Sequence, residues 1–277
     1  MISVIMPAYQ EAQNLDSAVA ETTAALQSQG LEYEIIVVDD GSTDATYERA
    51  LSLAKGHKEL RVFGYDRNMG KGYALKYGFQ FARGDVVVFL DADRDLPPYQ
   101  LTAYLDYMLQ NEKDIVIGSK RHPLSRVHVP LTRKVLSMAY GMLLKILFNL
   151  NVSDTQVGLK VFRKEVLQQI LPKVLVKKYA FDIEILANAR KLGYSIAELP
   201  VELHSSLGSK VNFKAVWFMF VDTLAVFYRM KILRYYDKVS DLNPRINQVS
   251  VGQRDSLRGL NSDGTKSVGN HSLSKDK

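Results

Sequence analysis

The sequence predicts an α/β fold, with a mostly parallel central sheet covered by helices on both faces. Over residues 1–118, short β-branched runs alternate regularly with longer segments of helical periodicity. The run Val86–Leu90 contains no polar residue, which is typical of a strand buried on both faces. Acidic turns directly follow several of these runs, at the sheet edge where parallel α/β proteins bind ligands.

The expected elements can be assigned in chain order. β-branched and apolar runs predict strands, which we expect at Ser3–Met6, Glu34–Val38, Leu60–Gly64, Val86–Leu90 and Ile115–Gly118. Apolar residues spaced three and four apart predict helices, which we expect at Leu15–Gln29, Ala45–Lys55, Lys71–Ala82 and Pro98–Leu109. We expect one domain at residues 1–236. Residues 237–277 are rich in Ser, Asn, Asp and Gly, which predicts a disordered tail.

Two later segments, about 130–150 and 213–233, are predicted to be amphipathic helices with basic flanks. They fit either buried core helices or a pair of helices in the headgroup region of a membrane, and the aromatic residues beside basic flanks favour the second interpretation. No stretch free of Asp, Glu, Lys and Arg exceeds ten residues, whereas a membrane-spanning helix needs about 20 apolar residues. The N-terminus has no signal-peptide pattern. We therefore expect a peripheral protein on the cytoplasmic side of a membrane.

The composition excludes several classes of site. The 277 residues include no cysteine, which excludes disulfides, thiolate metal sites and cysteine nucleophiles. Lys and Arg number 36 against 30 Asp and Glu, a net charge of +6. This excess is compatible with anionic ligands or an anionic membrane but is weak support for nucleic acid, so we expect no nucleic-acid partner. The glycine patterns of Rossmann and P-loop nucleotide sites are both absent from the sequence.

Acidic turns are the candidate functional feature. Asp39-Asp40-Gly41 and Asp91-Ala92-Asp93 each follow a predicted strand, as does the segment that ends in Glu11. Because like charges this close need a cation or hydrogen-bond donors, Asp91 and Asp93 are candidate ligands for Mg²⁺ or Mn²⁺, which would neutralise nucleotide phosphates. A carboxylate after the second strand can accept the ring N–H of uracil or guanine.

The ordered motifs resemble a known family. They are Pro7-x-Tyr9-x-Glu11, Val37-Val38-Asp39-Asp40-Gly41-Ser42, Asn68-x-Gly70-Lys71-Gly72, Leu90-Asp91-Ala92-Asp93 and Ile117-Gly118-Ser119-Lys120. Their order and spacing resemble the family-2 inverting glycosyltransferases with a GT-A fold. Two further segments, Asp154–Phe162 and Tyr179–Glu184, are similar to those of dolichyl-phosphate β-glucosyltransferases and their cousins, the dolichyl-phosphate mannose synthases.

The resemblance implies a role for each matching residue. Nucleoside or donor binding is implied for Pro7, Tyr9, Glu11, Val38, Asp40, Lys71, Asp91, Ala92 and Asp93, with Asp40 on the base. Asp91, Asp93 and Asp95 are implied as metal ligands. Lys120, Arg133 and Lys210 are implied as phosphate contacts that act with Asp91 and Asp93 in catalysis. Arg121 and Arg126 are further candidates for a cluster that would hold the acceptor phosphate.

The implied reaction moves glucose from UDP-glucose to a polyprenyl phosphate of the dolichyl type, with inversion. Such an acceptor is already ionised at pH 7 and needs no general base. GDP-mannose is the alternative donor, and a non-catalytic nucleotide-sugar-binding scaffold is the less favoured alternative. The chain lacks the Gln-x-x-Arg-Trp segment of processive polysaccharide synthases. The expected partners are the donor, the lipid acceptor and a membrane surface, together with an anchoring partner or a second copy of the chain.

Overall fold

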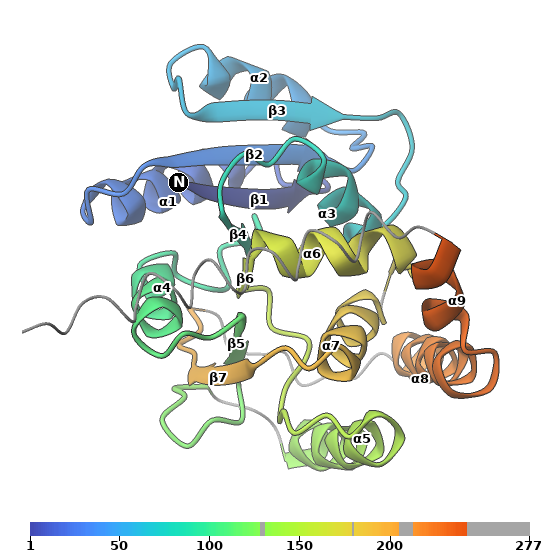
Figure 1. The fold of residues 1–277 in the computed structure, drawn as a ribbon. Coiled ribbons are helices and arrows are strands. Elements are labelled where there is room, and N and C mark those ends of the chain that lie inside the picture. Colours follow the sequence, from blue (N-terminus) through green and yellow to red (C-terminus); the bar gives the residue numbers. More distant parts are fainter. Residues whose placement is uncertain (128–130, 179, 205–212, 243–277) are drawn as a thin grey trace, which may run out of the picture. The chain divides into compact units, whose positions relative to one another are not determined.

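The computed structural model of the protein describes residues 1–127, 131–178, 180–204 and 213–242. The chain divides into two compact units, Met1–Tyr236 and Asp237–Lys277. All the described strands belong to the first unit, and Figure 1 shows how its elements are arranged.

Within the described residues, seven strands form a single sheet in the order β3-β2-β1-β4-β6-β5-β7. They are β1 (Ile2–Ala8), β2 (Tyr33–Asp39), β3 (Leu60–Gly64), β4 (Val86–Phe89), β5 (Ile115–Ser119), β6 (Lys160–Arg163) and β7 (Ile196–Pro200). Strand β6 runs antiparallel to both of its neighbours, whereas all other neighbouring strands are parallel. The mostly parallel α/β sheet predicted from the sequence is confirmed.

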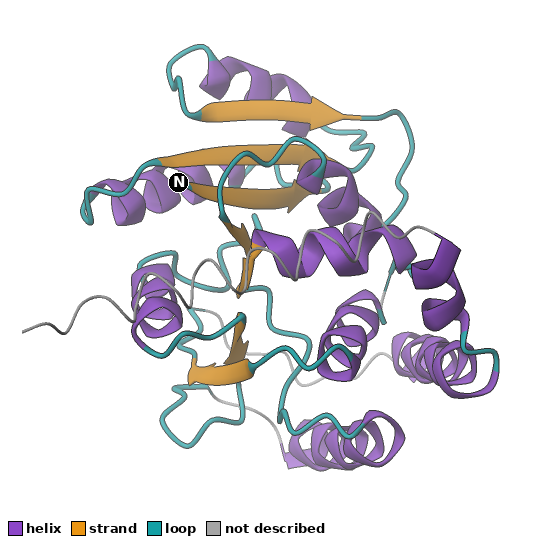
Figure 2. Ribbon diagram, viewed as in Figure 1, coloured by secondary structure: helices purple, strands orange, loops and turns teal. Residues whose placement is uncertain are grey.

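Helices connect most of the strands and also follow the last strand, β7 (Figure 2). They are α1 (Leu15–Gln27), α2 (Thr46–Ala54), α3 (Lys71–Phe79), α4 (Gln100–Gln110), α5 (Leu131–Phe148), α6 (Lys164–Ile170), η1 (Leu171–Lys173), α7 (Phe181–Lys191), α8 (Phe213–Phe227), the π-helical turn η2 (Tyr228–Ile232) and α9 (Tyr235–Leu242). The strands and helices predicted for the first half agree with these bounds to within three residues at each end.

Alternate strand residues build two cores, one on each face of the sheet. Ile5, Ile36 and Val87 belong to the core that also contains residues of α3, α6 and α7. Val4 and Val88 belong to the opposite core, with residues of α1 and α4. Each fully buried aliphatic side chain contributes about 1.5–3 kcal/mol through the hydrophobic effect. Because both faces are covered, polar chemistry is confined to the strand ends.

Two regions differ from the sequence-based expectation. Strands β6 and β7 are not among the predicted strands. Each contains a charged residue, Lys160 in β6 and Glu198 in β7, whose partners are distant in the sequence. The sequence predicts a disordered tail from residue 237, whereas helix α9 continues to Leu242. The helix is fixed at its first turn, where Tyr236 is buried and its hydroxyl donates to the carboxylate of Glu184. Residues 243–277 lie outside the described residues.

Candidate active site

The predicted acidic turns converge at one edge of the sheet. The parallel strands β1, β2 and β4 all end there, and the antiparallel strand β6 begins there, because Phe89 at the end of β4 pairs with Lys160. Backbone hydrogen bonds continue past the strands: the Asp40 amide donates to the Ala8 carbonyl at 2.8 Å. The fold therefore brings together three of the turns that the sequence singles out.

Asp40 is a structural acceptor in this arrangement. Its Oδ1 accepts hydrogen bonds from the Tyr65 hydroxyl and the Met69 amide, both at 2.7 Å, and its Oδ2 accepts from the Gly70 amide at 2.9 Å. Gly70 has φ +94°, a left-handed conformation that glycine adopts without steric cost. Asp40 thus holds the loop that leads into α3, and the predicted contact with the nucleoside base would use a remaining lone pair of Oδ2.

The neighbouring Asp39 has a different environment. It is buried, and its Oδ2 accepts one hydrogen bond, from the Ser42 amide at 3.2 Å. Its Oδ1 is buried without a hydrogen-bond partner in the described structure. Since buried polar atoms are rarely left unpaired, Asp39 is a second candidate acceptor for the ring N–H of a base, beside Asp40, for which the resemblance implies that contact.

The other predicted nucleoside contacts divide into side chains and backbone. Tyr9 is 45% exposed beside the turn, so its ring is available to stack on a base. Glu11 accepts a hydrogen bond from Asn14 at 2.8 Å, and Pro7 is the last residue but one of strand β1, which ends at Ala8. Val38 and Ala92 are buried in the two cores. Because their side chains face the cores, these two residues can contact a nucleotide only through their backbone.

Asp91 is held from two sides. The Lys71 Nζ lies 2.6 Å from its carboxylate, at the first residue of α3. On the other side the backbone approaches so closely that a Cβ on Gly158 would lie 2.2 Å from Asp91 Oδ2. Burial would lower the pKa of Lys71, but the charges of Asp91, Asp182 and Asp93 together raise it. Lys71 is therefore a cation fixed within the carboxylate site, and its donor-binding role stays a prediction.

Asp93 is the second carboxylate of the turn. Asp93 is exposed at the surface of the site. Partial desolvation and the neighbouring charge of Asp91 raise its pKa to about 6. The turn is fixed at its far end, where Arg94 has φ +61° and forms an ion pair with Glu21 of α1. Two carboxylates that repel one another at a fixed separation are suited to a divalent cation.

Metal binding by this turn depends on how many protein ligands it supplies. Among the described residues, no three His, Asp or Glu side chains are grouped as a ready-made metal site. The Asp95 amide donates to Asp93 Oδ1 at 3.0 Å, but the three predicted carboxylates do not form such a group. Mg²⁺ is commonly held by one or two carboxylates plus water and substrate phosphate. The pair Asp91 and Asp93 fits that coordination, and the role of Asp95 stays a prediction.

Lys120 is positioned by a network that the sequence did not reveal. Its amide donates to Asp154 Oδ2 at 3.2 Å, and the Gln156 amide donates to Asp154 Oδ1 at 2.9 Å. Glu198 of β7 holds this turn: its Oε1 accepts from the amides of Ser153 (2.7 Å) and Asp154 (3.0 Å) and from the Ser153 hydroxyl. A single Glu in a short strand gives no motif, so only the tertiary structure identifies it.

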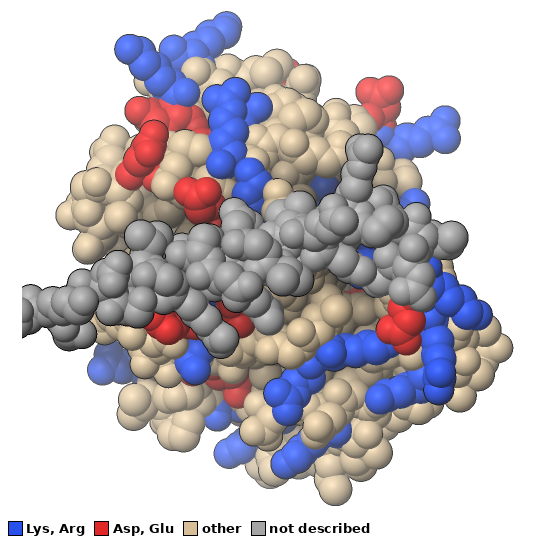
Figure 3. All heavy atoms as spheres, viewed as in Figure 1, with Lys and Arg blue, Asp and Glu red and all other residues tan. Residues whose placement is uncertain are grey.

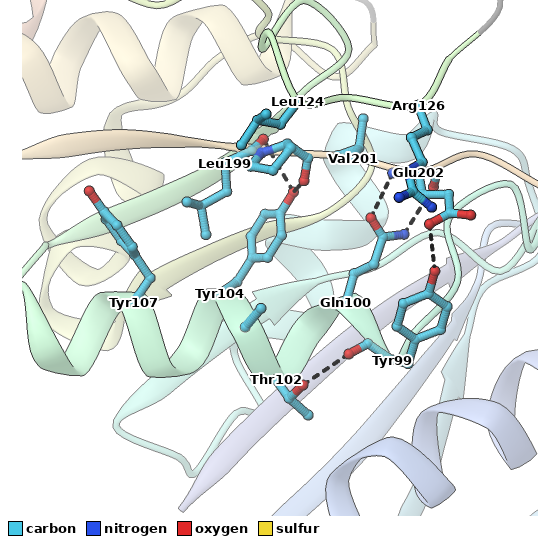
Figure 4. A pocket seen from close by; sticks show the side chains of 12 residues that line it. Tyr99, Gln100, Thr102, Tyr104, Tyr107, Leu124, Arg126, Leu199, Val201 and Glu202 are labelled. Atoms are coloured by element: carbon cyan, nitrogen blue, oxygen red, sulfur yellow. Dashed lines mark hydrogen bonds between the residues drawn. The ribbon is translucent and has the colours of Figure 1, made fainter.

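Of the candidate phosphate-binding cations whose side chains the structure describes, Arg121 and Arg126 lie against different elements. The Arg121 guanidinium lies against α5, where it donates to the Ser137 carbonyl at 2.8 Å and passes close to Gly141. Arg126 lines a separate pocket on the α4 side of β7 (Figure 4). The Arg133 side chain and residue Lys210 lie outside the described parts of the structure, so their predicted phosphate contacts stay predictions.

That pocket has a volume of about 540 Å³ and is lined by α4, the end of β7 and the loop near Arg126. The polar groups that line it are hydrogen-bonded to one another (Figure 4). The Tyr99 hydroxyl donates to the Glu202 carboxylate at 3.0 Å, and the Gln100 side chain donates to the Glu202 carbonyl and accepts from the Glu202 amide. The His204 amide then donates to the Asp95 carbonyl at 3.0 Å. These hydrogen bonds join the segment after β7 to α4 and to the turn that carries Asp93.

Asp182 and Glu184, in the motif at the start of α7, are both held by other protein groups. Asp182 forms a 3.0 Å ion pair with Lys160. Glu184 is completely buried, accepts hydrogen bonds from the Leu175 and Val176 amides, and pairs with Arg229. Glu184 thus joins α7 to η2 and has no exposed surface on which to contact a substrate.

Helices α5 and α8 expose many apolar side chains. Those more than half exposed are Leu131, Val135, Met138, Met142, Ile146 and Trp217. Exposed basic residues accompany them, including Lys145, Lys214 and Lys231. Figure 3 shows Lys and Arg side chains on the part of the surface where α5 and α8 lie in Figure 1. In the portion of the chain with described coordinates, no helix is both long enough and apolar enough to span a membrane.

Comparisons with known proteins agree with this geometry. Residues 3–171 match the family described as Glycosyl transferase family 2. Two relatives from Trichomonas vaginalis, named dolichyl-phosphate beta-glucosyltransferase ALG5D and ALG5A, are 32% and 33% identical, each over 86% of this chain and 76% of their own length. A dolichyl-phosphate beta-glucosyltransferase from Dictyostelium discoideum is 32% identical over 76% of this chain and 68% of its own.

Solved structures show the same fold. The mannosyl-3-phosphoglycerate synthase from Rubrobacter xylanophilus has a TM-score of 0.63 at 22% identity, over 83% of this chain and 74% of its own. The glucosyl-3-phosphoglycerate synthase from Mycobacterium tuberculosis, in complex with Mn²⁺, UDP-glucose and phosphoglyceric acid, has a TM-score of 0.62 at 21% identity, over 82% of this chain and 78% of its own. The chain, with its GT-A fold and its acidic turns at the carboxyl edge of the sheet, belongs to glycosyl transferase family 2 and is a glycosyltransferase.

Proposed function

We propose that this enzyme transfers glucose from UDP-glucose to the phosphate of a dolichyl-type polyprenyl phosphate, with inversion, at the surface of a membrane. The observation that carries the proposal is the similarity, over 86% of the chain, to proteins named dolichyl-phosphate beta-glucosyltransferases. The geometry of the acidic turns is consistent with a nucleotide-sugar donor, and the M. tuberculosis neighbour has been crystallised with UDP-glucose and Mn²⁺.

The state of the carboxylates supports a phosphate acceptor. A sugar or protein hydroxyl usually needs a general base to remove its proton. Outside the Asp91–Asp93 turn, the acidic residues of the segments Asp154–Phe162 and Tyr179–Glu184 already have protein partners. Asp154 accepts from two amides, Asp182 pairs with Lys160, and Glu184 pairs with Arg229. A phosphate monoester, whose second pKa is about 6, is already an anion at neutral pH. It needs orientation and partial neutralisation, which Lys120 can provide.

The donor would be bound across the carboxyl edge of the sheet. Tyr9 is available to stack on the base, and Asp39 and Asp40 can accept its ring N–H. Asp91 and Asp93 would hold Mg²⁺ or Mn²⁺, which when bound acts as a Lewis acid toward the departing diphosphate. Lys71 adds a fixed positive charge 2.6 Å from Asp91, and such preorganised charge stabilises a developing anion without reorganisation during the reaction.

Membrane action is supported by the exposed surface of α5 and α8. Apolar and aromatic side chains bordered by Lys and Arg are typical of helices that lie in the headgroup region, where basic residues also attract anionic lipids. Such placement would bring the enzyme to a lipid-linked acceptor. We propose peripheral association with the cytoplasmic side of the membrane, with an anchoring partner or a second copy of the chain as additional means of attachment.

The proposal is tested by transfer of radiolabelled sugar to polyprenyl phosphate in detergent, with Mg²⁺ or Mn²⁺. UDP-glucose and GDP-mannose are compared as donors, and lipid-extractable label is measured. Asp93→Ala should abolish transfer. Asp85→Ala is the matched control, because Asp85 is an exposed carboxylate at the opposite, amino end of β4.

Label from UDP-glucose that is lost in Asp93→Ala and kept in Asp85→Ala would support the donor, the acceptor and the role of the turn together. Label from GDP-mannose alone would replace the donor but keep the acceptor. No label from either donor, with intact binding of UDP or GDP, would refute the proposed reaction and favour a nucleotide-sugar-binding scaffold.

A further inference from the structure

A buried ion pair lies beneath the proposed donor site and joins the segments Asp154–Phe162 and Tyr179–Glu184, which resemble those of dolichyl-phosphate β-glucosyltransferases. Lys160, the first residue of β6, is 2% exposed, and its Nζ lies 3.0 Å from Asp182 Oδ1 in the first turn of α7. Neither residue has a role in the reaction proposed above. An ammonium group removed from water needs hydrogen-bond acceptors, so the groups that accept from the Lys160 Nζ are kept in position by it.

The second acceptor of Lys160 is the backbone of the turn that touches Asp91. Its Nζ donates to the Val157 carbonyl, one residue before Gly158. A Cβ on Gly158 would lie 2.2 Å from Asp91 Oδ2 and 2.6 Å from Asp91 Cγ. The backbone at this position is therefore in direct contact with the carboxylate, and a shift of the turn would displace Asp91.

Charged groups of both signs meet around this contact. Lys71 and Lys160 both lie near the carboxylates of Asp91 and Asp182, and Asp93 also acts on Lys71. Burial lowers the pKa of Lys160, whereas the carboxylate of Asp182 raises it. Removing one member would leave a buried charge uncompensated, whereas replacing both members of one pair by apolar residues leaves the net charge unchanged. Replacing both members of the pair therefore tests how the pair positions the Asp91 carboxylate without changing the net charge of the site.

We propose that Lys160 and Asp182 are positioning residues of the donor site: their buried ion pair holds the Val157–Gly158 turn against Asp91 and so fixes the carboxylate that binds the metal and the donor diphosphate. The inference rests on the proposed function, because it assumes that Asp91 receives a metal-bound nucleotide. It assigns the two segments a shared task beneath the site rather than direct contact with a substrate.

The test measures binding of Mn²⁺ to the full chain in the presence of UDP, by electron paramagnetic resonance of the free ion. Lys160→Met/Asp182→Leu replaces the ion pair with apolar side chains at constant net charge. Gly158→Ala inserts a methyl group where it must displace the Asp91 carboxylate. Glu34→Gln is the matched control, because Glu34 forms a buried ion pair with Arg61, at 2.8 Å, outside the donor site.

We expect both site variants to lose at least tenfold in Mn²⁺ affinity, and Glu34→Gln to change it less than twofold. Wild-type affinity in a folded Lys160→Met/Asp182→Leu would overturn the positioning role. If that variant does not fold, Gly158→Ala decides: unchanged affinity would show that the turn does not set Asp91. Failure of the wild-type protein to bind Mn²⁺ with UDP would instead refute the proposed function, and this inference with it.

Discussion

The adjacent residues Asp39 and Asp40 provide a sharp test of the site geometry, because one is an essential structural acceptor and the other is not. Asp40 accepts hydrogen bonds from Tyr65, Met69 and Gly70, and both of its oxygens are used. Asp39 accepts a single, longer bond at 3.2 Å, and its other oxygen has no partner among the described residues. Substitution by Asn removes one negative charge in either case, so the two variants are matched controls for each other.

The structure sets the expected magnitudes. In Asp40→Asn the amide oxygen can replace Oδ1 as an acceptor, but the amide N–H₂ then faces the Gly70 N–H. The 2.9 Å bond from Gly70 to Oδ2 is lost, and Gly70 keeps only its longer, 3.2 Å bond to the other oxygen. Hydrogen bonds to charged groups contribute about 1.5–3 kcal/mol, so we expect the free energy of unfolding to fall by that amount. With an m-value of about 2–3 kcal/mol per M, the urea midpoint falls by roughly 0.5–1.5 M. For Asp39→Asn we expect a change below about 1 kcal/mol.

The assay is urea denaturation of both variants, followed by tryptophan fluorescence and by circular dichroism to verify that the transition is cooperative. Equal midpoints for the two variants, or a larger loss in Asp39→Asn, would refute the assignment of Asp40 as the structural acceptor. The same two proteins titrated with UDP then show which carboxylate the nucleoside base requires.

Three further predictions follow from separate parts of the molecule. Glu198→Ala removes the acceptor that holds the Lys120 turn and should raise the KM for polyprenyl phosphate by about tenfold, equivalent to about 1.4 kcal/mol. Glu198→Gln keeps an acceptor oxygen and should have a KM close to that of the wild type. Equal KM values for the two variants would contradict the role of Glu198 in holding this turn. Burial opposes ionisation of Glu34, but hydrogen bonds from Ser3, Arg61 and the Arg83 amide outweigh burial and lower the pKa of Glu34 below 4.5. The ionised carboxylate therefore stabilises the fold above pH 4.5, and this contribution is lost as the pH falls further. The urea midpoints of the wild type and Glu34→Gln should therefore converge in acid. Trp217→Glu should weaken the affinity for anionic phospholipid vesicles, measured by co-sedimentation, by at least tenfold, since burying such a side chain contributes about 1.5–3 kcal/mol. Leu109→Glu is the control, because Leu109 of α4 is similarly exposed, and it should have no effect. Equal losses of affinity in the two variants would exclude α8 as the membrane contact.

Much of the fold could be predicted because it is encoded by local patterns. The strands and helices up to residue 119 follow from apolar periodicity, and the structure changes their ends by at most three residues. The meeting of the acidic turns also follows, since parallel strands end at the same edge of a sheet. The pattern failed for β6 and β7, because the buried lysine of β6 and the glutamate of β7 are compensated by partners distant in the sequence.

The amino-acid sequence by itself determined the α/β class, the order of the elements and the residue types gathered at the carboxyl edge, because each depends on spacing along the chain. Only the tertiary structure decided what each charged residue does there. It assigned Asp40 to a loop, Glu184 to the junction of α7 with η2, Arg121 to α5 and Lys160 to Asp182. The physical reason is that a buried charge must be paired, and its partner is set by proximity in three dimensions rather than by distance along the chain.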